Sequence, residues 1–219
     1  MKINKDISNN LNLAFNESKL MGCKILQNEK EVTTVFDQFA LLEDGRIPKD
    51  TRVKVVFENV SRIATLLKLG EWNDNKASIK TLSVESLSHE VSQLQGEEMY
   101  GWEFINIAKS DKDFHKWEKN ASLDLVFHTP QPETNTIDIF SEHLGENPKT
   151  LDLRIWFEKF RVETMLGEEI DEKEFIQRGQ RAWNKVFNGT HEYTDKTNSK
   201  MKRLNKPNII TKLKNIFKK

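Results

Sequence analysis

The segment TLDLRIWFEKFRVETML, residues 150–166, decides the fold. Its apolar residues alternate with polar ones at Leu151, Leu153, Ile155 and Phe157, and again at Phe160 and Val162. An alternation with a period of two is typical of a β-strand that buries one face. The charged pair 158–159 interrupts the alternation after Phe-Glu, which predicts a bulge or a sharp bend at that point.

A second segment, RVKVVFENVSRI (residues 52–63), has the same pattern as residues 152–163. The Phe-Glu dipeptide at 57–58 corresponds to the one at 157–158. This match is either a weak internal repeat or two strands that meet the same packing requirement. Trp156 falls on the face opposite the alternating apolar residues, so the closing helix predicted after residue 170 or a partner has to cover it.

Other apolar segments predict further strands and one ambiguous element. Strands are expected within residues 15–26, 31–42, 99–107, 122–128 and 135–143. The last two flank the turn-rich TPQPETN and are expected to form a hairpin, or to be neighbours in one sheet. Residues 77–94 fit either a strand, which we favour up to residue 86, or a helix with Ser83 as its N-cap. The polar residues 1–12 are expected to lack regular structure.

A helical period appears after residue 170. Asp171 followed by Glu174 is typical of a helix start, and Gly189 is placed to end the helix. The apolar stripe consists of Phe175, Ile176, Gly179, Trp183, Val186 and Phe187. Gly179 would let another backbone approach closely. The sequence predicts an α+β fold, mainly an antiparallel sheet or sandwich closed by this C-terminal helix. One domain is expected over residues 1–190, followed by a basic amphipathic tail over 191–219.

The formal net charge of zero conceals an uneven distribution. Nine of the 34 Lys and Arg residues lie within 196–219, which has no acid, so 25 basic and 34 acidic residues precede it. The body therefore has a net charge of about −9, and segregation of this kind is typical of an arm that is solvated or contacts an anionic surface. Within the tail, apolar residues share residues 209–219 with the cationic Lys212, Lys214, Lys218 and Lys219.

An anionic membrane surface is one alternative partner for this tail, since its apolar and cationic faces coincide. Nucleic acid is not expected, because the body is acidic and no aromatic stacking platform accompanies the lysines.

Cysteine usage and the N-terminal residues favour a cytoplasmic protein. The single cysteine, Cys23, excludes an intrachain disulfide framework and a four-thiolate zinc site. It follows Gly22 in an apolar segment and is expected to be a buried structural thiol. Residues 1–15 lack the apolar region of a signal peptide, and the sequence has no apolar run of about 18 residues.

Common catalytic motifs are absent from the sequence: it has no Gly-rich phosphate loop, no G-x-S-x-G, no H-E-x-x-H and no C-x-x-C. His128 and His143 end two predicted strands, and His115 lies upstream. A metal-dependent hydrolase that uses these three histidines is an alternative, although their spacing matches no ligand signature. We expect no catalytic residue, no metal and no cofactor.

The tryptophans suggest a protein-binding role. The core is expected to take Trp102, Trp156 and Trp183. Trp72 in LGEWNDN and Trp117 in FHKWEKN lie in polar segments that we expect to be loops. Exposed tryptophans in loops are typical anchors for a protein partner. Glu71 and Asp74 flank Trp72 and complete the expected partner-binding set.

Three segments, FNESKLMGCKIL, VVFENVSRI and WFEKFRVETMLGEEIDEKEFIQRGQRAW, together resemble small bacterial β-rich proteins of the polymorphic-toxin immunity type. The resemblance covers residues 15–187 and rests on a strand pattern followed by a short turn and a closing helix. It implies a non-enzymatic protein that neutralises a cognate toxin by binding it. The acidic body would suit a basic toxin through complementary fields. The resemblance assigns no site residue, and the basic tail departs from its pattern.

Overall fold

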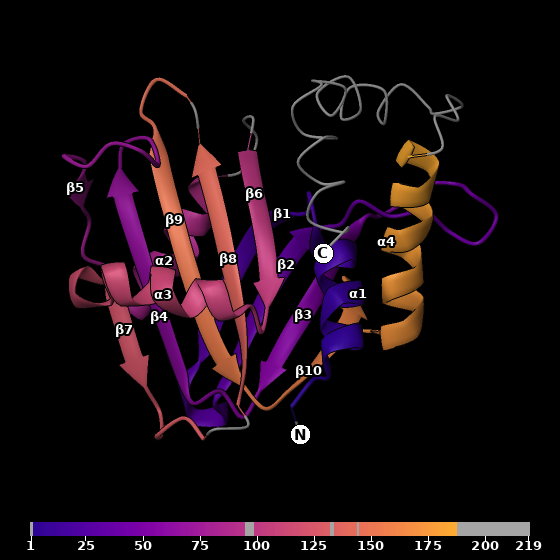
Figure 1. The fold of residues 1–219 in the computed structure, drawn as a ribbon, viewed down its shortest axis with the longest axis horizontal. Coiled ribbons are helices and arrows are strands. Elements are labelled where there is room, and N and C mark those ends of the chain that lie inside the picture. Colours follow the sequence, from indigo (N-terminus) through magenta and orange to yellow (C-terminus); the bar gives the residue numbers. More distant parts are fainter. Residues whose placement is uncertain (1, 95–98, 132–133, 144, 188–219) are drawn as a thin grey trace. The chain divides into compact units, whose positions relative to one another are not determined.

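The computed structural model describes residues 2–94, 99–131, 134–143 and 145–187 (Figure 1). The chain divides into two units, residues 1–181 and 182–219. In the second unit, the Trp183 ring stacks on the Phe187 ring with 5.6 Å between their centroids. The predicted tail, residues 191–219, and Gly189 lie outside the described residues. All other features described below belong to the first unit, except the last six residues of α4, 182–187.

The described helices are α1 (Lys5–Phe15), α2 (Val84–Gln93), α3 (Ala108–Trp117) and α4 (Glu172–Phe187), with 3-10 turns η1 (Gln27–Glu29) and η2 (Glu118–Asn120). The described strands are β1 (Lys19–Leu26), β2 (Glu31–Asp37), β3 (Arg52–Glu58), β4 (Arg62–Leu69), β5 (Ser78–Ile79), β6 (Met99–Ile105), β7 (Leu123–Val126), β8 (Asn135–His143), β9 (Lys149–Phe157), β10 (Lys159–Thr164) and β11 (Glu169–Ile170).

These strands form two antiparallel sheets. Sheet A has the order β1-β2-β3-β10-β11, and sheet B has the order β5-β4-β9-β8-β6, with β7 on the same edge of β4 as β5. In Figure 1, the first three strands of sheet A run diagonally behind the near-vertical strands of sheet B. The predicted α+β fold is confirmed.

The core lies between the two sheets and follows from the alternation in their strands. Its fully buried side chains include Val55 and Phe57 from sheet A, and Ile63, Leu67, Ile137, Leu151 and Ile155 from sheet B. Three helices extend the same core through Leu11, Phe15, Leu87, Val91, Phe175 and Ile176. Cys23 is also buried there, and burial raises the pKa of its thiol to about 12, as expected for a structural cysteine.

A bent two-stranded ribbon joins the sheets. β3 pairs with β10 in sheet A, while their continuations β4 and β9 pair in sheet B. At the bend, the Glu158 amide donates to the Glu58 carbonyl (3.2 Å) and the Ser61 amide donates to the Trp156 carbonyl (2.9 Å). The bend predicted after Phe-Glu is therefore confirmed, and both dipeptides lie at this one corner. Strands that change sheets through a bend are a known way to build such corners.

The N-terminal segment differs from its prediction. Residues 1–12 were expected to lack regular structure, and a strand was expected from residue 15, but α1 covers Lys5–Phe15. The Asn4 side chain caps this helix by accepting a hydrogen bond from the Ile7 amide (2.9 Å). The helical signal was present in the sequence as apolar residues spaced at i, i+4, i+8 and i+12, namely Ile3, Ile7, Leu11 and Phe15.

Two further predictions need correction. The strand favoured up to residue 86 is confirmed only for β5 (Ser78–Ile79). The helical alternative is right from Ser83, whose side chain caps α2 by accepting from the Ser86 amide (3.2 Å). The hairpin of residues 122–128 with 135–143 is also wrong, because β4 and β9 lie between β7 and β8 in sheet B. β8 instead pairs with β9, the strand that follows it directly.

The start of the closing helix agrees with its prediction. Asp171 accepts hydrogen bonds from the Lys173 and Glu174 amides at 2.9 and 3.2 Å. The Glu174 carboxylate bonds to two arginines of the same helix, Arg178 and Arg181, at 2.8 and 2.9 Å. This half of α4 packs on α1, where the Phe175 and Phe15 rings are 5.0 Å apart.

Gly179 lies where α4 and α1 approach each other closely. A Cβ atom added at Gly179 would lie 2.5 Å from the Ala14 Cα and 3.0 Å from its Cβ. Gly179→Ala should therefore destabilise the chain by about 1–3 kcal/mol through overpacking, although alanine is the better helix former. Urea unfolding measures this change.

Gly22→Ala is the matched control, since its added Cβ would lie 3.6 Å from Val35, an ordinary contact. A Gly179→Ala variant as stable as the Gly22→Ala variant would contradict this packing.

Candidate functional site

Sheet B presents a polar and aromatic outer face opposite its apolar inner face. The alternation that buries Ile63, Ile137 and Ile155 turns their neighbours outward, and the outward set includes Arg62, Asp138, Arg154 and Trp156. The register places Arg62 opposite Trp156, and Asp138 opposite Arg154. Trp156 was expected to be covered by the closing helix or by a partner; this is wrong, because the cover is α3, which crosses the front of this sheet in Figure 1.

Phe114 attaches α3 to this face. Its ring packs edge-on against the Trp156 ring at 4.9 Å, and the Trp117 ring packs edge-on against Phe114 at 4.9 Å. The guanidinium groups of Arg62 and Arg154 lie 5.0–5.2 Å from the centroids of both the Phe114 and Trp156 rings. Each such cation–π contact contributes roughly 0.5–2 kcal/mol, more where water is excluded.

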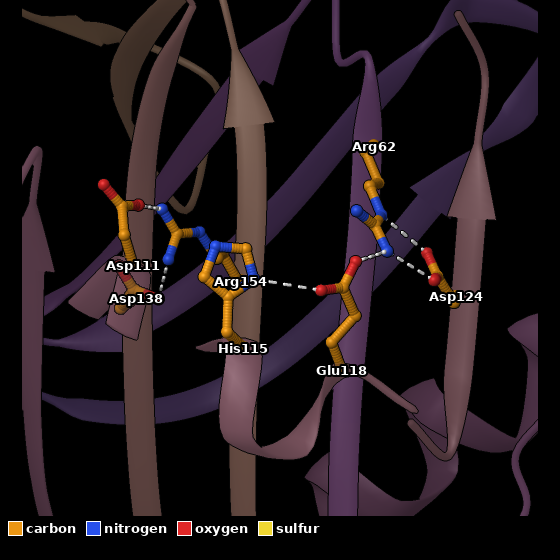
Figure 2. Close-up of polar contacts among 7 residues, drawn as sticks. All are labelled: Arg62, Asp111, His115, Glu118, Asp124, Asp138 and Arg154. Carbon is orange, nitrogen blue, oxygen red and sulfur yellow. Dashed lines mark hydrogen bonds and ion pairs between the residues drawn. The ribbon is translucent and has the colours of Figure 1, made fainter. Parts of the chain in front are cut away.

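Ion pairs extend this aromatic cluster in two directions (Figure 2). Arg62 donates to both carboxylate oxygens of Asp124 on β7, at 2.9 and 2.6 Å, and to Glu118 Oε1 at 3.1 Å. The second oxygen of Glu118 lies 3.1 Å from His115 Nδ1. Arg154 pairs with Asp111 of α3, and its Nη1 lies 3.6 Å from Asp138.

Arg154 is the most deeply buried charge of this cluster. Its side chain is 3% exposed, and its Nε and Nη1 atoms have no hydrogen-bond partner among the described residues. The same holds for Asp138 Oδ2. Asp111 is 61% exposed, so water screens its pair with Arg154, whereas Asp138 is 20% exposed. Arg154 and its two carboxylates therefore form an incompletely satisfied network beneath α3.

Two carboxyl groups on this face titrate near neutral pH. Burial raises the pKa of Asp138 to about 7, against the attraction of Arg154 and with repulsion from Asp111. Burial likewise raises the pKa of Asp152 to about 6, against the attraction of Lys68. Such groups can exchange protons at physiological pH, so the charge of this face changes between about pH 5 and pH 8.

A second candidate surface lies at the end of β4. Trp72 is 61% exposed, yet its backbone is fixed on both sides. Its amide donates to Glu142 Oε1 (3.0 Å), a buried carboxylate, and its carbonyl accepts from Lys68 Nζ (3.2 Å). Asp74 closes the loop by accepting from the Lys76 amide (2.8 Å). The loop position and exposure predicted for Trp72 are confirmed.

Glu71 and Asp74 are exposed beside Trp72, so the three predicted residues form one surface. Leu69 and Ile79 add apolar area nearby, because β4 and β5 pair at this end and both side chains are more than 40% exposed. The sequence predicted that Trp72 and its acidic neighbours form a binding surface. It did not predict the hydrogen bond from the Trp72 amide to Glu142, which is 70 residues away.

Other predicted site residues lie elsewhere. Trp117 was expected in a polar loop; this is wrong, because it ends α3 and is half-buried against Phe114. The described part of the chain contains no group of three or more His, Cys, Asp and Glu residues that could hold a metal ion. His115 lies exposed on α3, His128 follows β7, and His143 ends β8. The predicted membrane-binding lysines fall outside the described residues: Lys212, Lys214, Lys218 and Lys219.

No protein-family model, curated protein or solved structure matches this chain. The resemblance to immunity-type proteins therefore stays a prediction. Among the described helices, none combines the length and the apolar composition needed to cross a membrane.

Asp138→Asn should stabilise the chain at alkaline pH. Because the pKa of Asp138 is raised from 3.8 to about 7, the folded chain holds this proton more tightly than the unfolded chain does. Stability should therefore fall as the pH rises from about 4 to 7, and a neutral asparagine removes this contribution. We expect a gain of about 1–2 kcal/mol near pH 8, after allowing for the lost attraction to Arg154, measured by urea unfolding at several pH values.

Ser110→Ala is the control, because it keeps the carboxyl group and removes only a hydroxyl that hydrogen-bonds to Asp138. Its stability should show the same direction of pH dependence as the parent chain. Parallel pH profiles for the parent and Asp138→Asn chains would disprove the burial of an ionisable carboxyl at this position.

Proposed function

We propose that the chain is a non-enzymatic, cytoplasmic protein-binding module of the immunity type, which neutralises a toxin by binding it. The observation that carries this proposal is Trp72, a large aromatic side chain that is mostly exposed while its backbone is held in place. Tryptophan is among the residues most enriched at the energetic centres of protein interfaces.

The fixed backbone of the Trp72 loop favours a role for this side chain in binding. A partner that meets Trp72 does not have to order the loop first, so less conformational entropy is lost on association. The buried Glu142 carboxylate and Lys68 hold the loop from two sides. The two ends of the loop also pack closely at Gly70, because a Cβ atom added there would lie 2.7 Å from the Ala77 Cβ. The loop therefore resembles a preorganised anchor.

Charge suggests what the partner looks like. Glu71 and Asp74 are exposed next to the indole, and residues 1–195 carry a net charge of about −9. Complementary fields accelerate association and disfavour partners of the wrong sign. The partner surface should thus combine an apolar pocket for Trp72 with lysines or arginines around it, as a basic toxin would.

Trp72→Ala should weaken binding to such a partner at least about thirty-fold, the effect typical of a central interface residue. The partner is captured from the native host on the immobilised chain, identified by mass spectrometry and purified. Its dissociation constant is then measured by calorimetry for the parent and variant chains.

Leu166→Ala is the matched control, because Leu166 is 89% exposed in the turn between β10 and β11, away from β4. It should bind as tightly as the parent chain. Equal affinities of the parent and Trp72→Ala chains, or capture that yields no partner, would refute the proposal.

A further inference from the structure

α3 is attached to the outer face of sheet B separately from the main core. Phe114 is 4% exposed and packs in a small cluster with Ala64 and Trp156, to which Trp117 adds partial cover. Among the described residues of α3, none belongs to the main core. The other described side chains of this helix are exposed or half-buried. Elements with few buried apolar contacts open at lower free energy than the core does.

Three side chains with helical spacing make the charged and aromatic contacts of the attachment, and Ser110 adds a hydrogen bond to Asp138. Asp111, Phe114 and Glu118 follow one another at i, i+3 and i+7, so they share one face of the helix and the turn that continues it. Asp111 pairs with Arg154, Phe114 packs on Trp156, and Glu118 pairs with Arg62. Figure 2 shows the two charged contacts on either side of His115.

The receiving surface is therefore a row of two cations around one indole. Trp156 and Arg62 face each other across β9 and β4, and Arg154 precedes Trp156 by two residues on the same face. This row recognises an acid, an aromatic ring and a second acid presented by a helix. Docking of a helix through a few spaced anchors is a common mode of peptide recognition.

α3 leaves part of this surface unsatisfied. Arg154 Nε and Nη1 and Asp138 Oδ2 are enclosed without a hydrogen-bond partner in the described part of the chain. Buried polar atoms without partners are unfavourable, and a helix that supplied those bonds would gain the difference. A partner helix with the same three anchors as α3 gains over α3 only where it also supplies an acceptor to Arg154 or a donor to Asp138.

We propose that the row Arg62–Trp156–Arg154 is a docking site for a partner helix with the pattern acid-x-x-aromatic-x-x-x-acid, and that α3 occupies this site until the partner displaces it. The site is independent of Trp72, which lies at the other end of β4 and would meet a basic surface. A partner that uses both sites would offer a basic patch and an acidic helix.

Displacement is tested first on the parent chain by hydrogen exchange. The amides of α3 should exchange at least about ten-fold faster than those of β4 and β9, with no dependence on denaturant at low concentrations, as local opening requires. Exchange of α3 only through global unfolding would overturn the proposal.

Docking is tested with a synthetic, fluorescently labelled peptide of residues 107–121. The Phe114→Ala chain, whose own helix is weakly seated, should bind this peptide at least about ten-fold more tightly than the parent chain does, because its site is more often vacant. The peptide carrying Phe114→Ala should not bind, and the Trp72→Ala chain should behave as the parent chain.

If the Phe114→Ala chain fails to fold, the double variant Asp111→Asn and Glu118→Gln replaces it, because it weakens the ion pairs and keeps the aromatic cluster. A folded variant of either kind that shows no binding of the parent peptide would also overturn the proposal.

Discussion

The bent ribbon of β3–β4 with β10–β9 is the constraint on which both sheets depend. It supplies the middle strands of each sheet, so the two sheets cannot separate without breaking it. At the corner the Phe57 and Phe157 rings lie 4.8 Å apart and are almost fully buried. Asn59 takes a φ of 48°, a left-handed conformation that asparagine tolerates better than most residues. Aromatic packing inside the bend, and a permissive residue between β3 and β4, thus favour the change of sheets at this corner.

The ribbon also determines what the outer face of sheet B presents. Because the side-chain period is two, burying Leu153 and Ile155 inside obliges Arg154 and Trp156 to point outward. A lone indole on that face would expose a large apolar area, and α3 covers it with Phe114. The far end of β4 leads into the loop that presents Trp72. The candidate binding surfaces therefore follow from the same strand that turns the corner.

The sequence was informative where a pattern is local. Alternation identified β9 and β10 and their bend, and the Asp171 cap marked the start of α4. The sequence was misleading where the fold depends on strands that are far apart in the chain. β7 pairs with β4 and not with β8, and no turn residue between them indicates this. The attachment of α3 was also missed, because one buried aromatic in a polar helix gives almost no periodic signal. Its partners, Arg62 and Arg154, are far away in the chain and ordinary in sequence.

The most direct test of the shared ribbon is the cooperativity of the Phe157→Ala variant. Removing this ring should cost about 3–5 kcal/mol, as for other buried aromatics. Residue-resolved urea unfolding by NMR should show amides of β2 in sheet A and β8 in sheet B losing structure at one common, lowered midpoint. Two separate midpoints, with one sheet keeping the parent value, would contradict the claim that the ribbon unites them.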